Sequence, residues 1–187
     1  IAFEANLRLV EYFKHVPGCV VECGVWRGGM IAAISTIMGN DRTYFALASF
    51  EGLPEAQPID GFDALEYQKN TLSPGYFDNC KTEEHFAKEA MAIAGTPNYK
   101  IIRGWFRNTL PQMKFVSSIA VLRLDGDWYE STSICLKHLY KKVISGGLII
   151  IDDYYAWEGC RTAVNEFFSP LDVRKEEETG LCYVIKP

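Results

Sequence analysis

Residues 116–130 read VSSIAVLRLDGDWYE, an apolar strand pattern that leads directly into two carboxylates, Asp125 and Asp127. A helical pattern begins immediately after them. Residues 147–154, GLIIIDDY, repeat this arrangement and also run into two aspartates. Ligands bind at the carboxyl ends of the strands in an open parallel sheet, so the four aspartates are expected to share one crevice.

Four carboxylates at two neighbouring strand ends need a positive partner, because closely spaced carboxylates cannot all stay ionised alone. Magnesium binds oxygen ligands and keeps positions open for water or substrate, whereas zinc and iron favour histidine or cysteine, which this crevice lacks. Aspartate is also a favourable helix cap, so Asp127, Asp152 and Asp153 could instead cap the helices that follow. Four such acids at two strand ends favour a metal site over caps.

The length and charge of the chain limit the number of domains and the classes of function that it can have. Its 187 residues suit one domain, taken as residues 1–187, and the net charge is −5. The sequence has no basic run with interleaved aromatic residues, so a nucleic-acid surface is not expected. It also has no apolar run long enough to cross a membrane. These features favour chemistry on a small molecule.

The cysteines and histidines suggest no catalytic or zinc site. The six cysteines lack paired zinc spacing and are interpreted as free thiols in a reducing cytoplasm. His15, His85 and His138 fall in predicted helices, away from the strand ends. The chain begins with Ile1 rather than methionine, and we expect an N-terminal element to precede it.

Strand and helix patterns alternate along almost the whole chain, which predicts an α/β fold with a mostly parallel sheet. Predicted strands cover residues 19–23, 43–48, 99–103, 116–124, 147–151, 172–174 and 181–185. Predicted helices cover residues 1–16, 30–38, 62–72, 82–94, 129–143 and 159–168, with a short one starting at Asn108. Residues 145–147, SGG, are expected to end the helix before the fifth strand.

A glycine turn, residues 24–29, joins the first strand to the next helix. Glycine lets a ligand approach the backbone, and the helix start offers free amides. The dinucleotide fingerprint G-x-G-x-x-G is broken here, because Trp26 stands at its second glycine. A pyrophosphate is therefore not the expected ligand.

Four stretches in this order resemble the macrocin O-methyltransferase family: VECGVWRGG (21–29), SFEGLP (49–54), LDGDWYEST (124–132) and GGLIIIDDY (146–154). The resemblance implies a Rossmann-like class I methyltransferase fold, in which helices flank a twisted, mostly parallel sheet that ends in an antiparallel hairpin. It implies methyl transfer from S-adenosylmethionine, with Mg²⁺, to a hydroxyl of a sugar or glycosylated natural product. A cytoplasmic homo-oligomer is expected.

The resemblance also assigns roles to individual residues. It implies that Asp125, Asp152 and Asp153 bind the metal and that Asp127 is the catalytic base. Cofactor contacts are expected from the following residues: Glu22, Gly24, Val25, Arg27 and Gly28, with Ser49 near the ribose and adenine. Trp105 could stack on the adenine or belong to the core.

The chain departs from the family pattern at two positions. Ala48 stands where the family usually has an aspartate, and an acid at the end of the second strand holds ribose hydroxyls. Met30 stands where a serine or threonine is usual. One alternative is therefore a non-catalytic binding domain that keeps the fold. Another is a hydrolase or phosphotransferase using the same aspartates, although the chain lacks a phosphate-binding loop.

Overall fold

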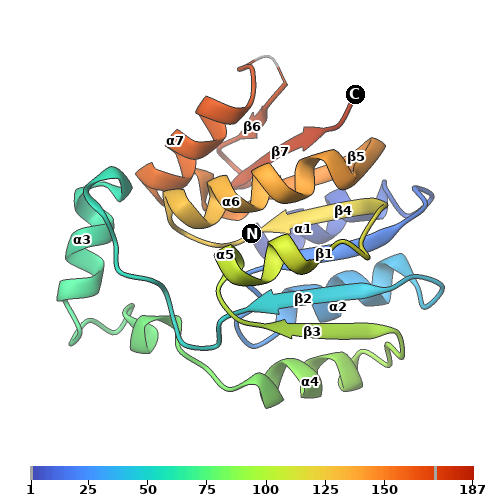
Figure 1. Ribbon diagram of the computed structural model, residues 1–187, viewed down its shortest axis with the longest axis horizontal. Helices are drawn as coiled ribbons and strands as arrows, with labels where there is room; N and C mark the ends of the chain where they lie inside the picture. Colours follow the sequence, from blue (N-terminus) through green and yellow to red (C-terminus); the bar gives the residue numbers. More distant parts are fainter. Residues whose placement is uncertain (1, 171) are drawn as a thin grey trace.

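The computed structural model describes residues 2–170 and 172–187, and its centre is a seven-stranded sheet (Figure 1). The strand order is β3-β2-β1-β4-β5-β7-β6. Strands β1 to β5 pair in parallel, whereas β7 pairs antiparallel with both β5 and β6. The bounds are β1 Cys19–Cys23, β2 Tyr44–Ala48, β3 Tyr99–Arg103, β4 Ile119–Leu124, β5 Val143–Ile151, β6 Arg174–Glu176 and β7 Leu181–Ile185. The predicted parallel sheet with a closing hairpin is confirmed.

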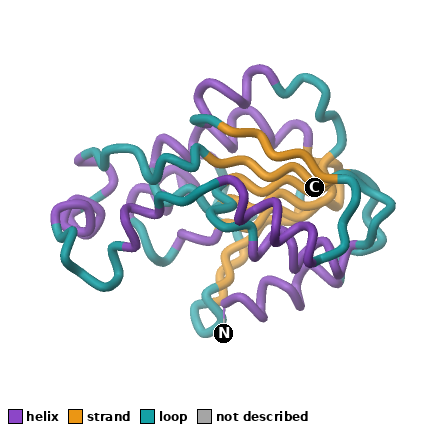
Figure 2. The backbone as a smooth tube through the Cα atoms, turned by 90° about the horizontal axis from the view of Figure 1, so that it is seen from below, coloured by secondary structure: helices purple, strands orange, loops and turns teal. Residues whose placement is uncertain are grey.

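Helices cover both faces of this sheet (Figure 2). One layer holds α1 (Ala2–Glu11), α2 (Gly29–Met38) and α4 (Glu84–Ile93), and the other holds α5 (Phe106–Thr109), α6 (Tyr129–Leu139) and α7 (Glu158–Phe167). Successive strand residues point to opposite faces: Phe45 and Leu47 pack on the α6 side, and Ala46 packs on the α2 side. The sheet is therefore buried on both faces, which explains its nearly continuous apolar runs.

Residues 53–80 leave the sheet after β2 and lie beyond the carboxyl ends of the strands, on the left of Figure 1. This excursion carries α3 (Phe62–Lys69). Trp128 Nε1 donates a hydrogen bond to the Pro54 carbonyl at 2.9 Å, and Asp60 Oδ1 accepts one from the Tyr129 amide at 2.7 Å. The excursion is thus tied to the residues that follow β4. Short 3-10 turns are Pro58–Asp60, Phe77–Cys80, Leu110–Gln112, Tyr140–Lys142 and Asp152–Tyr154.

Several element ends differ from the predicted ones. The first helix ends at Glu11 rather than at residue 16, and Ile1 lies outside the described residues. Helix α6 ends at Leu139, so the prediction of helix to residue 143 was wrong. Residues 145–147 belong to β5, because the Gly146 amide donates to Lys186 and the Lys186 amide donates to Gly147. Pairing with the end of the chain, 40 residues away in sequence, overrides the local glycine signal.

The last hairpin is shifted along the sequence relative to the prediction. Strand β6 covers Arg174–Glu176 rather than residues 172–174, because Glu176 pairs with Leu181 and Arg174 pairs with Tyr183. The strands predicted at residues 19–23, 99–103 and 181–185 have the bounds of β1, β3 and β7. Element type was therefore predicted better than element ends.

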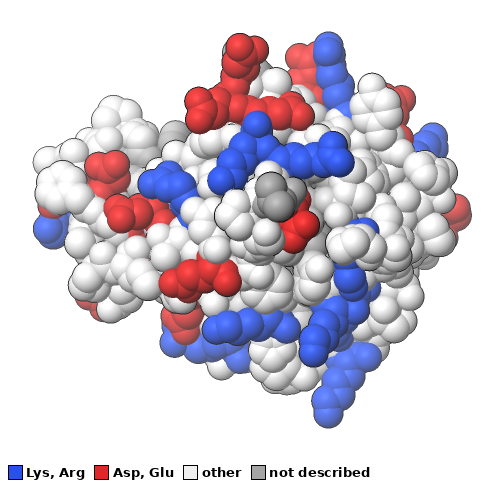
Figure 3. All heavy atoms as spheres, turned by 90° about the horizontal axis from the view of Figure 1, so that it is seen from above, with Lys and Arg blue, Asp and Glu red and all other residues white. Residues whose placement is uncertain are grey.

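Acidic and basic side chains are interleaved on the face of the molecule shown in Figure 3. Among the described residues, none of the helices has the length and apolar character needed to span a membrane.

Gly24 locks the turn after β1 against the end of β4. Its φ is +96°, and a Cβ built on it would lie 1.5 Å from the carbonyl oxygen of Asp125. The Asp125 amide also donates to the Cys23 carbonyl at 2.8 Å. Only glycine fits this position, since any side chain would force the two strand ends apart. The turn and the acids are consequently held side by side.

Gly24→Ala is expected to lower the free energy of unfolding by at least about 2 kcal/mol, because the new methyl group collides with backbone. Urea unfolding measures this loss. Gly29→Ala is the control: no heavy atom lies within 4 Å of its Cβ position, at the start of α2. That variant should be neutral or more stable by roughly 0.4–1 kcal/mol. Equal losses in the two variants would contradict this account of Gly24.

Candidate active site

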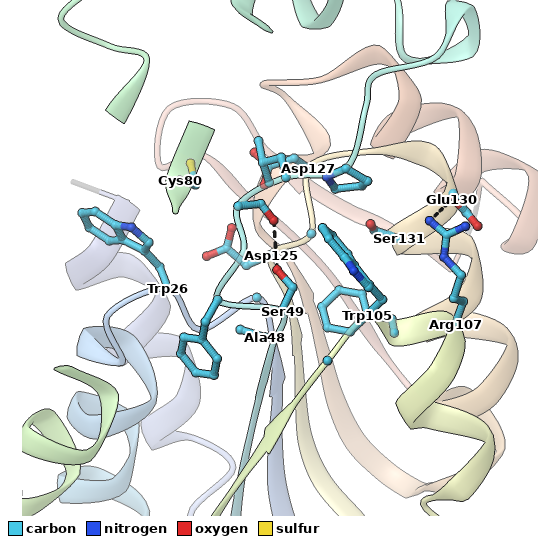
Figure 4. A pocket seen from close by; sticks show the side chains of 18 of the residues that line it. Trp26, Ala48, Ser49, Cys80, Trp105, Arg107, Asp125, Asp127, Glu130 and Ser131 are labelled. Carbon is cyan, nitrogen blue, oxygen red and sulfur yellow. Dashed lines mark hydrogen bonds and ion pairs between the residues drawn. The ribbon is translucent and has the colours of Figure 1, made fainter. Parts of the chain in front are cut away.

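A cavity opens at the carboxyl ends of β1 to β4 (Figure 4). Trp26 and Trp105 face it from opposite sides, and Asp125 lies between them in this view. Five of the predicted site residues line it: Gly24, Ser49, Trp105, Asp125 and Asp127. The remaining six lie behind or beside this lining: Glu22, Val25, Arg27, Gly28, Asp152 and Asp153. The predicted crevice at the carboxyl edge is therefore present, but only two of the four aspartates, Asp125 and Asp127, line it.

The half of the cavity beside β2 and β3 is mainly apolar. Its walls include Trp26, Phe50 and Phe106, together with the half-buried Trp105. Ala48 also lines this half, so a methyl group occupies the position at the end of β2. The Ser49 hydroxyl donates to the Gly52 carbonyl and accepts from the Glu51 amide, both at 3.0 Å. Ser49 therefore shapes the turn that borders the cavity.

The glycine turn after β1 is packed rather than open. Val25 is buried, and the guanidinium of Arg27 lies 4.7 Å from the Trp26 ring centroid and 5.0 Å from that of Phe86. A Cβ on Gly28 would lie 2.8 Å from the Cα of Ala87 in α4. Arg27 and Gly28 thus join the turn to α4, and their roles as cofactor contacts stay predictions.

Arg123 places one buried positive charge among three carboxylates. Its side chain is 3% exposed, and its Nη1 contacts Glu22 Oε1 at 2.5 Å and Asp125 Oδ2 at 2.7 Å. Its Nη2 contacts Asp152 Oδ1 at 2.5 Å. Glu22 and Arg123 are direct neighbours across β1 and β4. Asp152 therefore faces Arg123, and the guanidinium links acids from three strands.

The other three aspartates converge. Asp125, Asp127 and Asp153 each offer one carboxylate oxygen, and these atoms all lie within 4.8 Å of one another. Asp127 has a left-handed backbone, with φ +59°, and its amide donates to Asp153 Oδ2 at 2.9 Å. Its own Oδ1 accepts a 2.9 Å hydrogen bond from Trp157 Nε1. Three hard oxygen donors at this spacing fit a magnesium ion.

Burial raises the pKa of these acids. Desolvation, followed by the charge of Asp125, raises the pKa of Asp127 to about 7. Desolvation also raises the pKa of Asp153 well above its ordinary value, with the charges of Asp127 and Asp125 adding to the effect. The pKa of Asp125 is raised by burial as well, although Arg123 opposes the shift. A bound divalent cation would favour the ionised forms and relieve this cost.

The acids do not serve as caps of the following helices. The N-cap residues of α6 and α7 are Trp128 and Trp157, each without a side-chain cap hydrogen bond. At the start of α6, the amide of Tyr129 instead donates to Asp60, from the excursion. The Asp127 carboxylate accepts a hydrogen bond from Trp157. The Asp153 carboxylate accepts one from the Asp127 amide. This geometry favours the site interpretation over the capping one.

Sequence reasoning missed two residues of this site. The sequence could have predicted the role of Arg123, because an arginine inside the apolar run AVLRL of a buried strand needs a carboxylate partner. The sequence could not have predicted the role of Trp157, since no local pattern links it to Asp127, 30 residues earlier.

The strand order and the carboxyl-edge cavity are those of the Rossmann-like class I methyltransferases. The solved structure of the O-methyltransferase NovP matches with a TM-score of 0.76 and 30% identity, covering 97% of this chain and 79% of that chain. The chain belongs to the macrocin-O-methyltransferase (TylF) family, whose model matches residues 5–177. The fold and family expected from the four motifs are confirmed.

Two curated relatives are similar over most of the chain. The demethyldecarbamoylnovobiocin O-methyltransferase of Streptomyces niveus is 35% identical over 180 residues, or 87% of this chain and 63% of the relative. The 8-demethyl-8-(2,3-dimethoxy-alpha-L-rhamnosyl)-tetracenomycin-C 4'-O-methyltransferase of Streptomyces olivaceus is 34% identical over 160 residues, or 81% of this chain and 58% of the relative. The chain thus spans about three fifths of the length of these relatives.

Glu22 provides a prediction about pH. It is 1% exposed, no described residue bonds to its Oε2, and burial raises its pKa from 4.5 to about 7 despite Arg123. Between these values Glu22 is protonated in the folded protein and ionised in the unfolded chain. The folded state binds more protons in this window, so its stability falls as the pH rises through it.

Glu22→Gln should remove this part of the pH dependence. In chelator-treated protein, we expect the melting temperature to fall by several degrees more in the wild type than in the variant between pH 4.5 and 7. Acids remote from Glu22 titrate alike in both proteins and cancel in the difference. If the melting temperatures of the two proteins changed equally with pH, Glu22 would already be ionised in the folded protein near pH 4.5.

Proposed function

We propose that the protein transfers a methyl group from S-adenosylmethionine to a hydroxyl oxygen of a sugar or glycosylated natural product, with Mg²⁺. The observation that carries this proposal is the convergence of Asp125, Asp127 and Asp153 beside the cavity at the Gly24 turn. The family match and the rhamnosyl acceptor in the name of the Streptomyces olivaceus relative support the reaction and the acceptor class.

The proposed metal ligands are Asp125, Asp152 and Asp153. Asp125 and Asp153 already lie in the carboxylate cluster. Asp152 is bonded to Arg123, and in this proposal it joins the other two by giving up that ion pair. Arg123 would keep Glu22 and Asp125 as partners, so its charge would remain compensated.

When bound, S-adenosylmethionine supplies an activated methyl group, and Mg²⁺ lowers the pKa of the acceptor hydroxyl. Asp127 is the proposed base that removes the hydroxyl proton. With the cation bound, the Asp127 carboxylate would be ionised and able to accept a proton near neutral pH. The cavity walls would orient the two substrates, and the excursion beyond the strand ends would keep water away. Much of the catalysis would then be positioning.

The aromatic and glycine walls of the cavity fit the cofactor, with Gly24 and Ser49 beside it and Trp105 able to stack on the adenine. The end of β2 fits it less well, because Ala48 offers the ribose no hydrogen-bond acceptor from its side chain. A non-catalytic binding domain is the second candidate function for this reason. A cytoplasmic location, a homo-oligomer and a single domain over residues 1–187 stay predictions.

The proposal is tested by incubating the protein with S-adenosylmethionine, Mg²⁺ and a panel of glycosides, and measuring acceptor mass. We expect a cofactor-dependent gain of one methylene group. Asp152→Asn combined with Asp153→Asn should abolish this gain and the magnesium-induced rise in melting temperature, because both ligands are lost. The metal-free variant should stay folded, because the removal of like charges offsets the loss of the Asp152–Arg123 ion pair and Arg123 keeps Glu22 and Asp125 as partners.

Asp63→Asn combined with Asp172→Asn is the matched control, since it removes two exposed aspartates outside the cavity lining. It should keep both activity and metal stabilisation. Calorimetric titration with S-adenosylmethionine separates the alternatives: binding without methyl transfer to any glycoside favours the binding domain. No binding at all would contradict both.

Ala48→Asp is expected to tighten S-adenosylmethionine binding by roughly tenfold, because a carboxylate at this lining position can accept hydrogen bonds from both ribose hydroxyls. Calorimetry on the two proteins measures the gain. It should vanish for an analogue that lacks the ribose hydroxyls. A folded variant with unchanged affinity would mean that the ribose lies elsewhere, and a melt checks that the new carboxylate does not destabilise the protein.

A further inference from the structure

Trp157 contacts the proposed base from a different part of the chain. It is the N-cap residue of α7, and its indole Nε1–H donates to Asp127 Oδ1 at 2.9 Å. The two residues are 30 positions apart, so this hydrogen bond depends on the packing of α7 against α6, the helix that follows Asp127. It is the only side-chain hydrogen bond found for the Asp127 carboxylate among residues 2–170 and 172–187.

The indole of Trp157 is itself held in place. It is half-buried, and its ring centroid lies 5.0 Å from that of Trp128 at an interplanar angle of 75°. Tyr67 of α3 packs on it at 5.6 Å and 65°, and the Tyr67 hydroxyl donates to the Tyr76 carbonyl at 2.6 Å. Edge-to-face contacts of this kind fix both the position and the tilt of a ring. The indole is therefore a rigid donor.

Two features besides the hydrogen bond from Trp157 constrain Asp127. Its backbone is left-handed, with φ +59°, and its amide is bonded to Asp153 Oδ2. These contacts fix the main chain but leave the carboxylate free to rotate about its side-chain bonds. The bond to Trp157 removes that freedom, because it holds one of the two carboxylate oxygens. The other oxygen is then left in a defined direction to accept a proton.

We propose that Trp157 is a positioning residue that orients the Asp127 carboxylate for removal of the acceptor proton. The inference rests on the proposed function, in which Asp127 is the base. Trp157 acts through Asp127 and does not line the cavity. Its loss should therefore slow the chemical step while leaving cofactor and acceptor binding intact.

Trp157→Phe removes the donor and keeps an aromatic ring against Trp128 and Tyr67. We expect kcat to fall about tenfold to a hundredfold, with little change in KM for either substrate, because orientation contributes to the transition state alone. Tyr44→Phe is the matched control, since it removes a 2.6 Å hydrogen bond from the Tyr44 hydroxyl to the Gly39 carbonyl, and Tyr44 does not line the cavity. It should lower the melting temperature but change kcat less than twofold. In an Asp127→Asn background, Trp157→Phe should have no further effect on kcat.

A measurement without turnover tests the same contact. The chain has four tryptophans, so an indole nitrogen-labelled sample gives four resolvable N–H signals, and Trp157→Phe identifies one of them. Asp127→Ala should move the Trp157 signal strongly upfield, whereas Asp63→Asn should not move it. This experiment stays informative if no acceptor is methylated, so failure of the proposed function and failure of this inference are distinguishable.

Two results would overturn the inference. One is a Trp157 signal that ignores the replacement of Asp127, and the other is a folded Trp157→Phe variant with wild-type kcat. If Trp157→Phe does not fold, the signal shift in Asp127→Ala decides the question, with the Trp157 signal assigned by sequential methods.

Discussion

The buried charge of Arg123 is the constraint on which the carboxyl edge of this sheet depends. One guanidinium, 3% exposed, contacts carboxylates that follow or belong to β1, β4 and β5. Removing it would leave three acids without a counter-charge in a poorly solvated place, which is far more costly than losing one surface ion pair. The strand ends are therefore held together by charge as well as by their ladders of hydrogen bonds. Arg123 thus compensates Glu22, Asp125 and Asp152, which lie around it.

Backbone geometry then separates the acids into two groups. Gly24 allows the β1 turn to touch the Asp125 carbonyl, and this contact fixes where β4 ends. Two residues later the chain turns back through the left-handed φ of Asp127, a conformation that aspartate tolerates better than most residues. The turn directs Asp127 toward Asp153 and away from Arg123. Asp125 and Asp152 thus pair with Arg123, whereas no ion pair is found for Asp127 or Asp153 among the described residues.

The parts of this site that sequence could predict are those with a local signature. Apolar strands ending in aspartates, and the glycine turn after the first strand, predicted the carboxyl-edge cavity, which the structure has. The pairing of Asp152 with Arg123, the Trp157 bond and the tie between Asp60 and Tyr129 join residues 29 to 69 positions apart. Such contacts depend on how the elements pack. The end of α6 was mispredicted for the same reason, since Val143 pairs with Ile119 of β4 and Gly146 and Gly147 pair with Lys186.

The proposed function gives the two halves of the cavity separable tasks. The half beside β2 and β3 is aromatic and apolar, and it contains Ala48. The half beside β4 and β5 contains the acids, whose positions depend on Arg123 and Trp157 and not on the end of β2. Under this proposal, a change at Ala48 would alter cofactor binding without disturbing the acids. An alanine here is compatible with retained chemistry, because the residues proposed to bind metal and remove the proton are held by independent contacts.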